Sequence, residues 1–215
     1  GGNHFVEFGR ISLQADNVLG VPEGSYAALL SHSGSRGLGA AIAKHYSLLA
    51  RDICCLPREA QHFAWLGLDT EEGQEYWLSM NLAGDYARAC HERIHLNLAK
   101  ALGLKPLANV NNHHNFAWKE GLASGQTAIV HRKGATPAQK GLPGLIPGSM
   151  ATPGYLVCGK GVGEALCSAS HGAGRAMSRQ KAKDSFTQSA LKKYLSQAGV
   201  TLIGGSVEEM PLAYK

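Results

Sequence analysis

The chain places one histidine in a glycine-rich stretch that suits chemistry at a phosphate group. The stretch reads Ser170-His171-Gly172-Ala173-Gly174-Arg175, and Arg179 follows four residues after Arg175. If a helix begins at Arg175, both arginines lie on one face of it. The glycines let the backbone approach a bound group closely, and a helix N-terminus there favours an anion. The pattern predicts a phosphate site around His171, with an ordinary capped helix as the alternative.

Three further segments place histidines in polar surroundings. They are His4 at the start of a strand pattern, His32 in Ser31-His32-Ser33-Gly34-Ser35-Arg36, and the neighbours His113 and His114 among asparagines. Adjacent strand residues point to opposite faces, so at most one of His113 and His114 can face a given site. Histidines that converge in a fold commonly hold zinc, or manganese with added carboxylates. Loop histidines bonded to the backbone are the alternative.

Four cations accompany these histidines and are suited to bind anions: Arg36, Lys133, Arg175 and Arg179. Together, the two sets of residues predict metal-assisted chemistry at phosphate. In such chemistry the metal neutralises developing charge, and an imidazole acts either as the nucleophile or as the acid and base.

The composition is that of a globular protein large enough to bury a core. The chain has 215 residues, of which 44% are hydrophobic and 17% charged. A formal net charge of +5 and a pI near 9.0 are compatible with a nucleic-acid or nucleotide partner. We expect no membrane span and no leader, because no sufficiently long apolar run occurs. The five cysteines form no CxxC pair, so we expect no disulfide framework and a cytoplasmic location.

The elements that must position these residues follow from periodicity and from capping and turn residues. We expect strands at 4–8, 25–30, 127–130, 155–158 and 200–203, and helices at 40–52, 71–102 and 188–198. His91 and His95 stand four residues apart on the long helix, a spacing that can bind metal. We instead expect them on a solvated face, since no acidic general base lies between them in the metalloprotease pattern. The sequence predicts one continuous domain.

Six motifs occur in one order and together resemble a known family. They are Gly-Gly-Asn-His-Phe-Val-Glu, Ser-His-Ser-Gly-Ser-Arg-Gly, Asn-His-His-Asn-Phe, Arg-Lys-Gly-Ala, Ile-Pro-Gly-Ser-Met and Ser-His-Gly-Ala-Gly-Arg-x-Met-Ser-Arg. The series closely resembles the RtcB family of RNA-splicing and RNA-repair ligases, over essentially the whole chain. The resemblance implies an α+β fold, a single mixed α/β domain over residues 1–215. Its metal and nucleotide site would be built from strand ends and glycine-rich loops.

The resemblance also implies a reaction and its residues. The family joins an RNA 3′-phosphate or 2′,3′-cyclic phosphate to a 5′-hydroxyl, using GTP and manganese, with two ions in the intact site. His171 would attack the GTP α-phosphate and carry GMP. The implied manganese ligands are His4, His32 and His114. The implied guanylate contacts are Asn3, Phe5, Glu7, Asn115, Ser149, Ala173 and Gly174. The implied phosphate or RNA contacts are Arg36, Lys133, Arg175 and Arg179.

The sequence departs from the family pattern at its two ends. The family has an upstream Asp and Cys motif, whose cysteine bridges the two metals, and a terminal lysine that contacts the nucleotide. Neither occurs here, so we expect the chain to be a fragment of a longer ligase, incomplete at both ends. Two other classes of function stay open. One is a metal-dependent phosphoesterase, and the other is a catalytically incomplete nucleotide- or RNA-binding module.

Overall fold

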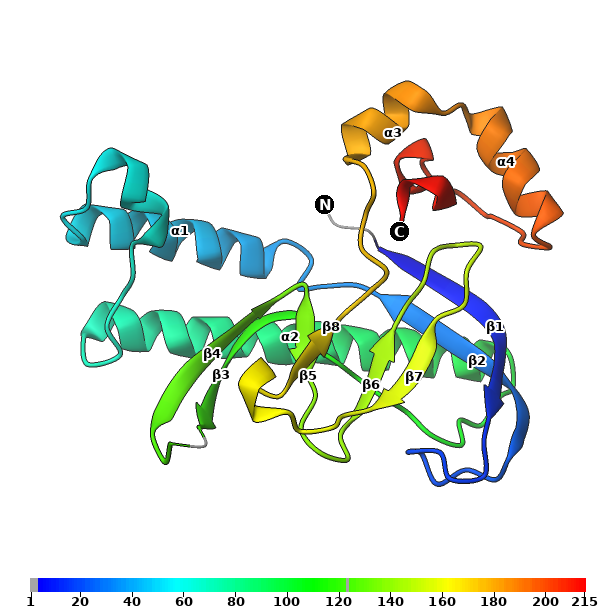
Figure 1. Ribbon diagram of the computed structural model, residues 1–215, viewed down its shortest axis with the longest axis horizontal. Helices are drawn as coiled ribbons and strands as arrows, with labels where there is room; N and C mark the ends of the chain where they lie inside the picture. The colour runs from blue at the N-terminus through cyan, green and yellow to red at the C-terminus, as the bar shows by residue number, and fades with distance from the viewer. Residues whose placement is uncertain (1–3, 123) are drawn as a thin grey trace. The chain divides into compact units, whose positions relative to one another are not determined.

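The chain folds as an α+β protein, as the sequence predicts. The structure is a computed structural model that describes residues 4–122 and 124–215. Within these residues the strands form four two-stranded antiparallel sheets (Figure 1). No helix within the described residues is both long enough and apolar enough to cross a membrane. The chain divides into two compact units, and the single domain over 1–215 stays a prediction.

The first unit comprises residues 1–13 and 24–107. Its elements are β1 (Phe5–Leu13), β2 (Gly24–His32), α1 (Leu38–Ile53), η1 (Arg58–Phe63) and α2 (Glu71–Ala101). Helix α2 begins where Thr70 accepts a hydrogen bond from the Gly73 amide, a standard N-cap. Helices α1 and α2 pack together, with Tyr46 stacked on Tyr76 at 5.0 Å between ring centroids.

The second unit comprises residues 14–23 and 108–215. Its strands are β3 (Asn115–Gly121), β4 (Thr127–Lys133), β5 (Ala135–Pro137), β6 (Pro143–Ile146), β7 (Tyr155–Cys158) and β8 (Ser168–Ser170). Its helices are η2 (Gly163–Ala165), α3 (Arg179–Ser185), α4 (Gln188–Gln197), η3 (Val207–Glu209) and η4 (Pro211–Ala213). Leu191, Leu195 and Met210 form a buried cluster that joins α4 to the C-terminal turns.

Most predicted elements are confirmed with shifted ends, one expected strand is wrong, and the helix considered at Arg175 begins later. Helix α3 begins at Arg179 and not at Arg175, because the Ser178 hydroxyl caps it by accepting from the Lys181 amide. Residues 200–203 form no strand. The Val200 amide donates to the Leu195 carbonyl, and the Leu202 side chain packs on the α4 cluster. A short apolar run cannot by itself distinguish a strand from an irregular segment that covers a core.

Candidate functional site

In the first unit, the ends of β1 and β2 bring His4, His32 and Arg36 to one place. The antiparallel register pairs Phe5 with His32, the last residue of β2, and the two rings lie 5.6 Å apart. His4, the residue before Phe5, has its Nδ1 3.2 Å from Arg36 Nη1. A guanidinium only donates, so His4 Nδ1 accepts this hydrogen bond. One predicted phosphate contact and two predicted metal ligands are therefore neighbours.

The loop between β2 and α1 is shaped by its own polar groups. The Ser35 hydroxyl accepts a hydrogen bond from the Gly39 amide at 2.7 Å, which helps to start α1. Arg36 has a left-handed backbone at φ 54°, a conformation that is uncommon outside glycine. The Ser33 hydroxyl is buried and has no hydrogen-bond partner within the described parts of the chain. The Ser35 hydroxyl oxygen is thus already engaged within the loop.

Two predicted guanylate contacts, Phe5 and Glu7, lie on β1, two residues apart and therefore on the same face. Burial raises the pKa of the Glu7 carboxyl above its ordinary value. The third residue predicted at this end, Asn3, lies outside the described residues.

His91 and His95 do not form a solvated face, so that expectation is wrong. His95 Nε2 lies 2.8 Å from the Ser31 hydroxyl of β2, and His91 Nε2 is buried without a hydrogen-bond partner in the described part of the chain. The face they occupy on α2 packs against β2. Burial, and then the nearby His91, lower the pKa of His95. Sequence periodicity could not show this contact, which joins residues 64 positions apart.

We expect His95 to make the protein less stable in mild acid. Its folded pKa lies below the unfolded value of about 6.5, so as pH falls through that value the unfolded chain takes up a proton first. Stability should therefore decrease between about pH 7 and pH 5, by less than about 1 kcal/mol because the ring is only partly buried. The measurement is the urea midpoint at both pH values for the parent and for His95→Gln, in which this decrease should shrink. His62→Gln, at an exposed position, should leave the decrease unchanged. An unchanged decrease in His95→Gln would contradict the assignment.

In the second unit, β3, β4, β5 and β8 place His114 beside His171. Their rings stack with centroids 4.6 Å apart and planes inclined by 18°. His114 immediately precedes β3, and His171 immediately follows β8. Gly134, between β4 and β5, donates its amide to the His114 carbonyl at 3.0 Å, and its own carbonyl accepts from the His171 amide at 3.4 Å. Asn115 Oδ1 also accepts from the Gly134 amide, at 3.2 Å.

Gly134 has a backbone conformation that lets its chain pass close to the His171 ring. Its φ is +69°, and a Cβ added there would lie 3.6 Å from His171 Cε1 and 3.7 Å from Nδ1. We expect Gly134→Ala to lower the free energy of unfolding by about 1–2 kcal/mol through left-handed strain, and to shift the ring resonances of His171. Urea unfolding and NMR measure the two effects.

Gly125→Ala is the matched control, with φ +80° and no atom within 4 Å of the added Cβ. It should cost comparable stability and leave the His171 resonances in place. Equal resonance shifts in both variants would contradict a specific role of Gly134 at the ring.

Two loops flank the glycine-rich turn that follows His171. A Cβ added at Gly172 would lie 3.7 Å from the Pro147 carbonyl, which places the loop carrying Ser149 beside this turn. The Ser149 amide donates to Thr152 Oγ1 at 2.7 Å. On the other flank, the Gly174 carbonyl accepts from the Lys215 amide at 3.1 Å. The predicted guanylate contacts Asn115, Ser149, Ala173 and Gly174 all belong to this unit.

Of the two cations at the end of β4, Arg132 is buried. Its side chain is 1% exposed and binds both carboxylate oxygens of Glu120 at 2.8 Å. It also donates to Ser168 Oγ and the Leu166 carbonyl, and it lies over the Trp118 ring. The hydrogen bond from Arg132 holds the pKa of Glu120 below its usual value. Arg132 is therefore committed to contacts inside the protein, and of these two cations only Lys133 is exposed.

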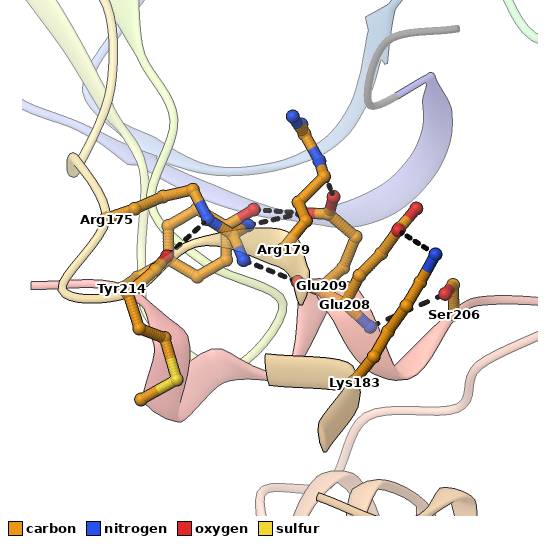
Figure 2. A network of polar contacts seen from close by, with 8 residues as sticks. Arg175, Arg179, Lys183, Ser206, Glu208, Glu209 and Tyr214 are labelled. Atoms are coloured by element: carbon orange, nitrogen blue, oxygen red, sulfur yellow. Dashed lines mark hydrogen bonds and ion pairs between the residues drawn. The ribbon is translucent and has the colours of Figure 1, made fainter. Parts of the chain in front are cut away.

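Arg175 and Arg179 meet at one carboxylate although they do not share a helix face. Arg175 forms a β-bridge with Tyr214, and Arg179 begins α3. Glu209 lies between them, with Arg175 Nη1 3.3 Å from Oε2 and Arg179 Nε 3.1 Å from Oε1 (Figure 2). The Tyr214 hydroxyl also donates to Glu209, and burial followed by this bond raises the pKa of Tyr214 to about 12.

The predicted manganese ligands fit a transition metal by their chemistry, since imidazole nitrogens are suitable donors. Across residues 4–122 and 124–215, however, no group of three or more His, Cys, Asp or Glu side chains lies close enough to hold an ion. His4 and His32 belong to the first unit and His114 to the second. The ligand set stays a prediction.

Sequence reasoning missed Gly134, Glu120, Glu209 and Tyr214 as parts of these surroundings. Gly134 had a signal, because a glycine directly after a strand often marks a left-handed backbone. The two glutamates and Tyr214 had none, because each acts through a partner distant in sequence.

The fold and the geometry around His171 define an α+β protein in which two histidines at strand ends stack beside a glycine-rich turn. The family model for the tRNA-splicing ligase RtcB matches residues 1–215, and the chain belongs to this family. It is 32% identical to RNA-splicing ligase RtcB1 of Escherichia coli and 31% identical to tRNA-splicing ligase RtcB of Nanoarchaeum equitans. Each match covers 100% of this chain but 53% and 52% of the relatives. The chain thus spans about half the length of these curated relatives.

Proposed function

We propose that this chain carries the nucleotidyl-transfer chemistry of a GTP- and manganese-dependent RNA ligase. The ligase would join an RNA 3′-phosphate or 2′,3′-cyclic phosphate to a 5′-hydroxyl in RNA repair or tRNA splicing, in the cytoplasm. The observation that carries the proposal is His171, which follows β8, stacks on His114 and precedes a glycine-rich turn and two arginines. The names of the relatives, RNA-splicing and tRNA-splicing ligases, support the same reaction class.

In the proposed reaction His171 is the nucleophile. A neutral imidazole nitrogen attacks the α-phosphate of GTP, a P–N bond forms, and the P–O bond to pyrophosphate breaks. An oxygen of the RNA 3′-phosphate then takes the GMP from His171, which regenerates the imidazole. Finally the 5′-hydroxyl attacks the activated 3′-phosphate and GMP leaves. A cyclic phosphate must first be opened by water to give the 3′-phosphate.

The other predicted residues serve binding in this proposal. Asn115, Ser149, Ala173 and Gly174 are close to His171 in sequence or through the flanking loops, and they would contact the guanylate together with Asn3, Phe5 and Glu7. Lys133 and Arg179 have exposed side chains that can reach phosphate oxygens, and Arg36 is placed beside His4. Manganese, held by His4, His32 and His114, would supply positive charge at the phosphates.

The experiment that tests the proposal is covalent labelling with α-phosphate-labelled GTP and manganese. The expected product is a protein–GMP adduct that is stable to alkali and labile to acid, as a phosphoramidate is, and peptide mapping should place it on His171. The Escherichia coli relative, run in parallel, is the positive control. If the relative is labelled and this chain is not, the proposal is wrong for this chain. Hydrolysis of a cyclic phosphate without an adduct would instead indicate a phosphoesterase, and RNA or GTP binding alone a binding module.

A further inference from the structure

Arg175 is bonded within the protein through each of its three guanidinium nitrogens. Its Nε donates to the Met177 carbonyl at 3.1 Å, its Nη1 to Glu209 at 3.3 Å and its Nη2 to the Glu208 carbonyl at 2.6 Å. Its guanidinium also lies over the Tyr214 ring, 4.8 Å from the centroid. All three nitrogens therefore have partners before any ligand arrives. An arginine in this state holds the chain together and has little capacity left for a phosphate.

Arg179 is bonded differently to the same carboxylate. Only its Nε, the inner nitrogen, donates to Glu209, at 3.1 Å. No residue within 4–122 or 124–215 accepts a hydrogen bond from its two terminal nitrogens, and Figure 2 shows that end of the side chain pointing away from Glu209. The side chain is 49% exposed, against 22% for Arg175. Two parallel N–H groups in this arrangement match two oxygens of a phosphate.

Glu209 itself is fixed on several sides. Its Oε2 accepts from Arg175 and from the Tyr214 hydroxyl, and its Oε1 accepts from Arg179. The next residue, Met210, is 2% exposed and belongs to the buried cluster on α4. The carboxylate is therefore anchored to the core of its unit. A shallow groove, wide open to solvent, runs along residues 175–179, beside the exposed arginine.

The charges around this groove favour an anion. The network contains three cations, Arg175, Arg179 and Lys183, and two carboxylates, Glu208 and Glu209. Lys183 is paired with Glu208 at 2.9 Å, so the surplus positive charge belongs to the two arginines that share Glu209. Because Arg175 is enclosed, that surplus is presented through Arg179.

We propose that Glu209 is a positioning residue that holds Arg179 by its inner nitrogen, so that the outer pair of N–H groups binds the 3′-phosphate of an RNA strand, while Arg175 braces the carboxylate from inside. This proposal rests on the proposed function for its ligand. It separates the roles of the two arginines, both of which were predicted to contact phosphate or RNA. Fixing the guanidinium beforehand reduces the entropy lost when the phosphate binds.

The test measures the affinity of the protein for a short single-stranded RNA with a 3′-phosphate and for the same RNA with a 3′-hydroxyl. The ratio of the two affinities isolates the phosphate contribution. We expect the parent to prefer the 3′-phosphate, and Glu209→Gln and Arg179→Gln each to reduce this preference by about tenfold. Glu208→Gln, which makes the same charge change on a side chain bonded to Lys183, should keep it. In the double variant, the loss should equal that of Arg179→Gln alone, because both changes act through one guanidinium.

The double variant, Arg179→Gln with Glu209→Gln, distinguishes positioning from a general structural effect. A general structural effect of Glu209→Gln would add to the loss of preference caused by Arg179→Gln. If Glu209→Gln does not fold, Glu209→Asp replaces it in the test. Aspartate keeps the negative charge but is one methylene shorter, so its carboxylate lies farther from Arg179 and the preference for the 3′-phosphate should also weaken. The proposal is overturned if Glu209→Gln keeps the preference, if the two losses add, or if the parent shows no preference. Labelling of His171 by GTP is measured on the same samples. A labelled parent without these effects rejects the role of Glu209, whereas an unlabelled parent rejects the proposed function.

Discussion

Replacement of His171 by asparagine is expected to reduce the rate of protein–GMP formation by about 10³-fold or more. In the proposed reaction the imidazole forms the P–N bond, and an asparagine amide has no basic nitrogen that could replace it. Asparagine keeps a planar polar group beside His114 and Gly134, so the surrounding strands should be preserved. The measurement is the initial rate of labelling by α-labelled GTP at saturating manganese, with circular dichroism to verify folding.

His131→Asn is the control for this prediction. His131 is an exposed histidine of β4, and it should leave the labelling rate unchanged. Residual labelling of His171→Asn at a rate comparable to the parent would show that another residue carries the GMP. Labelling that disappears in both variants would indicate damage to the β3–β4 hairpin and would contradict the assignment of a specific nucleophile.

Replacement of Arg132 by methionine is expected to lower the free energy of unfolding by about 3 kcal/mol or more. The change leaves Glu120, whose side chain is 19% exposed, without its bidentate partner, and an uncompensated charge in such a place typically costs about 3–5 kcal/mol. It also removes the donors to the Leu166 carbonyl and to Ser168, the first residue of β8, which His171 follows. Urea unfolding at neutral pH measures the loss.

Acidification gives a second measurement of the same pair. Because Arg132 lowers the folded pKa of Glu120, the pair contributes stability above the unfolded pKa of about 4.3, and that contribution is lost as pH falls through the folded pKa. The parent should therefore lose this part of its stability on acidification, and Arg132→Met should not.

Two controls complete this prediction. Lys119→Met, an exposed change on the same hairpin, should alter stability by less than about 0.5 kcal/mol. The double change Arg132→Met with Glu120→Leu should recover part of the loss, because no carboxylate is then left without its partner. A loss in Arg132→Met no larger than in Lys119→Met would contradict a structural role for the pair.

The residues at strand ends could be predicted well because their signals are local. His32 ends β2 and Lys133 ends β4, each next to glycine or serine. The same local pattern predicted α1, α2 and α4 to within a few residues. Periodicity, caps and turn residues all act over a few positions, so each element can be predicted from its own segment of the sequence.

The expectations that failed concern residues whose partners lie far along the chain. Arg175 was considered as a possible start of a helix, yet its backbone pairs with Tyr214 and its side chain with Glu209. Arg132 precedes the exposed Lys133 in sequence, yet its side chain is buried and binds Glu120 across the β3–β4 hairpin. His95 was expected on a solvated face of its helix, yet its Nε2 lies within hydrogen-bond distance of the Ser31 hydroxyl. In each case a long-range contact decided what the side chain does.

The sequence alone determined the α+β class, the strands β1, β2, β4 and β7, the helices α1, α2 and α4, and, through six ordered motifs, the family. These depend on local backbone preferences and on residue types at fixed spacing, which a chain carries before it folds. Only the tertiary structure decided that Arg175 and Arg132 are enclosed, that Arg179 keeps its outer nitrogens exposed, and that Gly134 supports His171. The physical reason is that a charged side chain has two possible uses, to pair inside the protein or to meet a ligand. The choice depends on which distant carboxylate or carbonyl the fold brings to it.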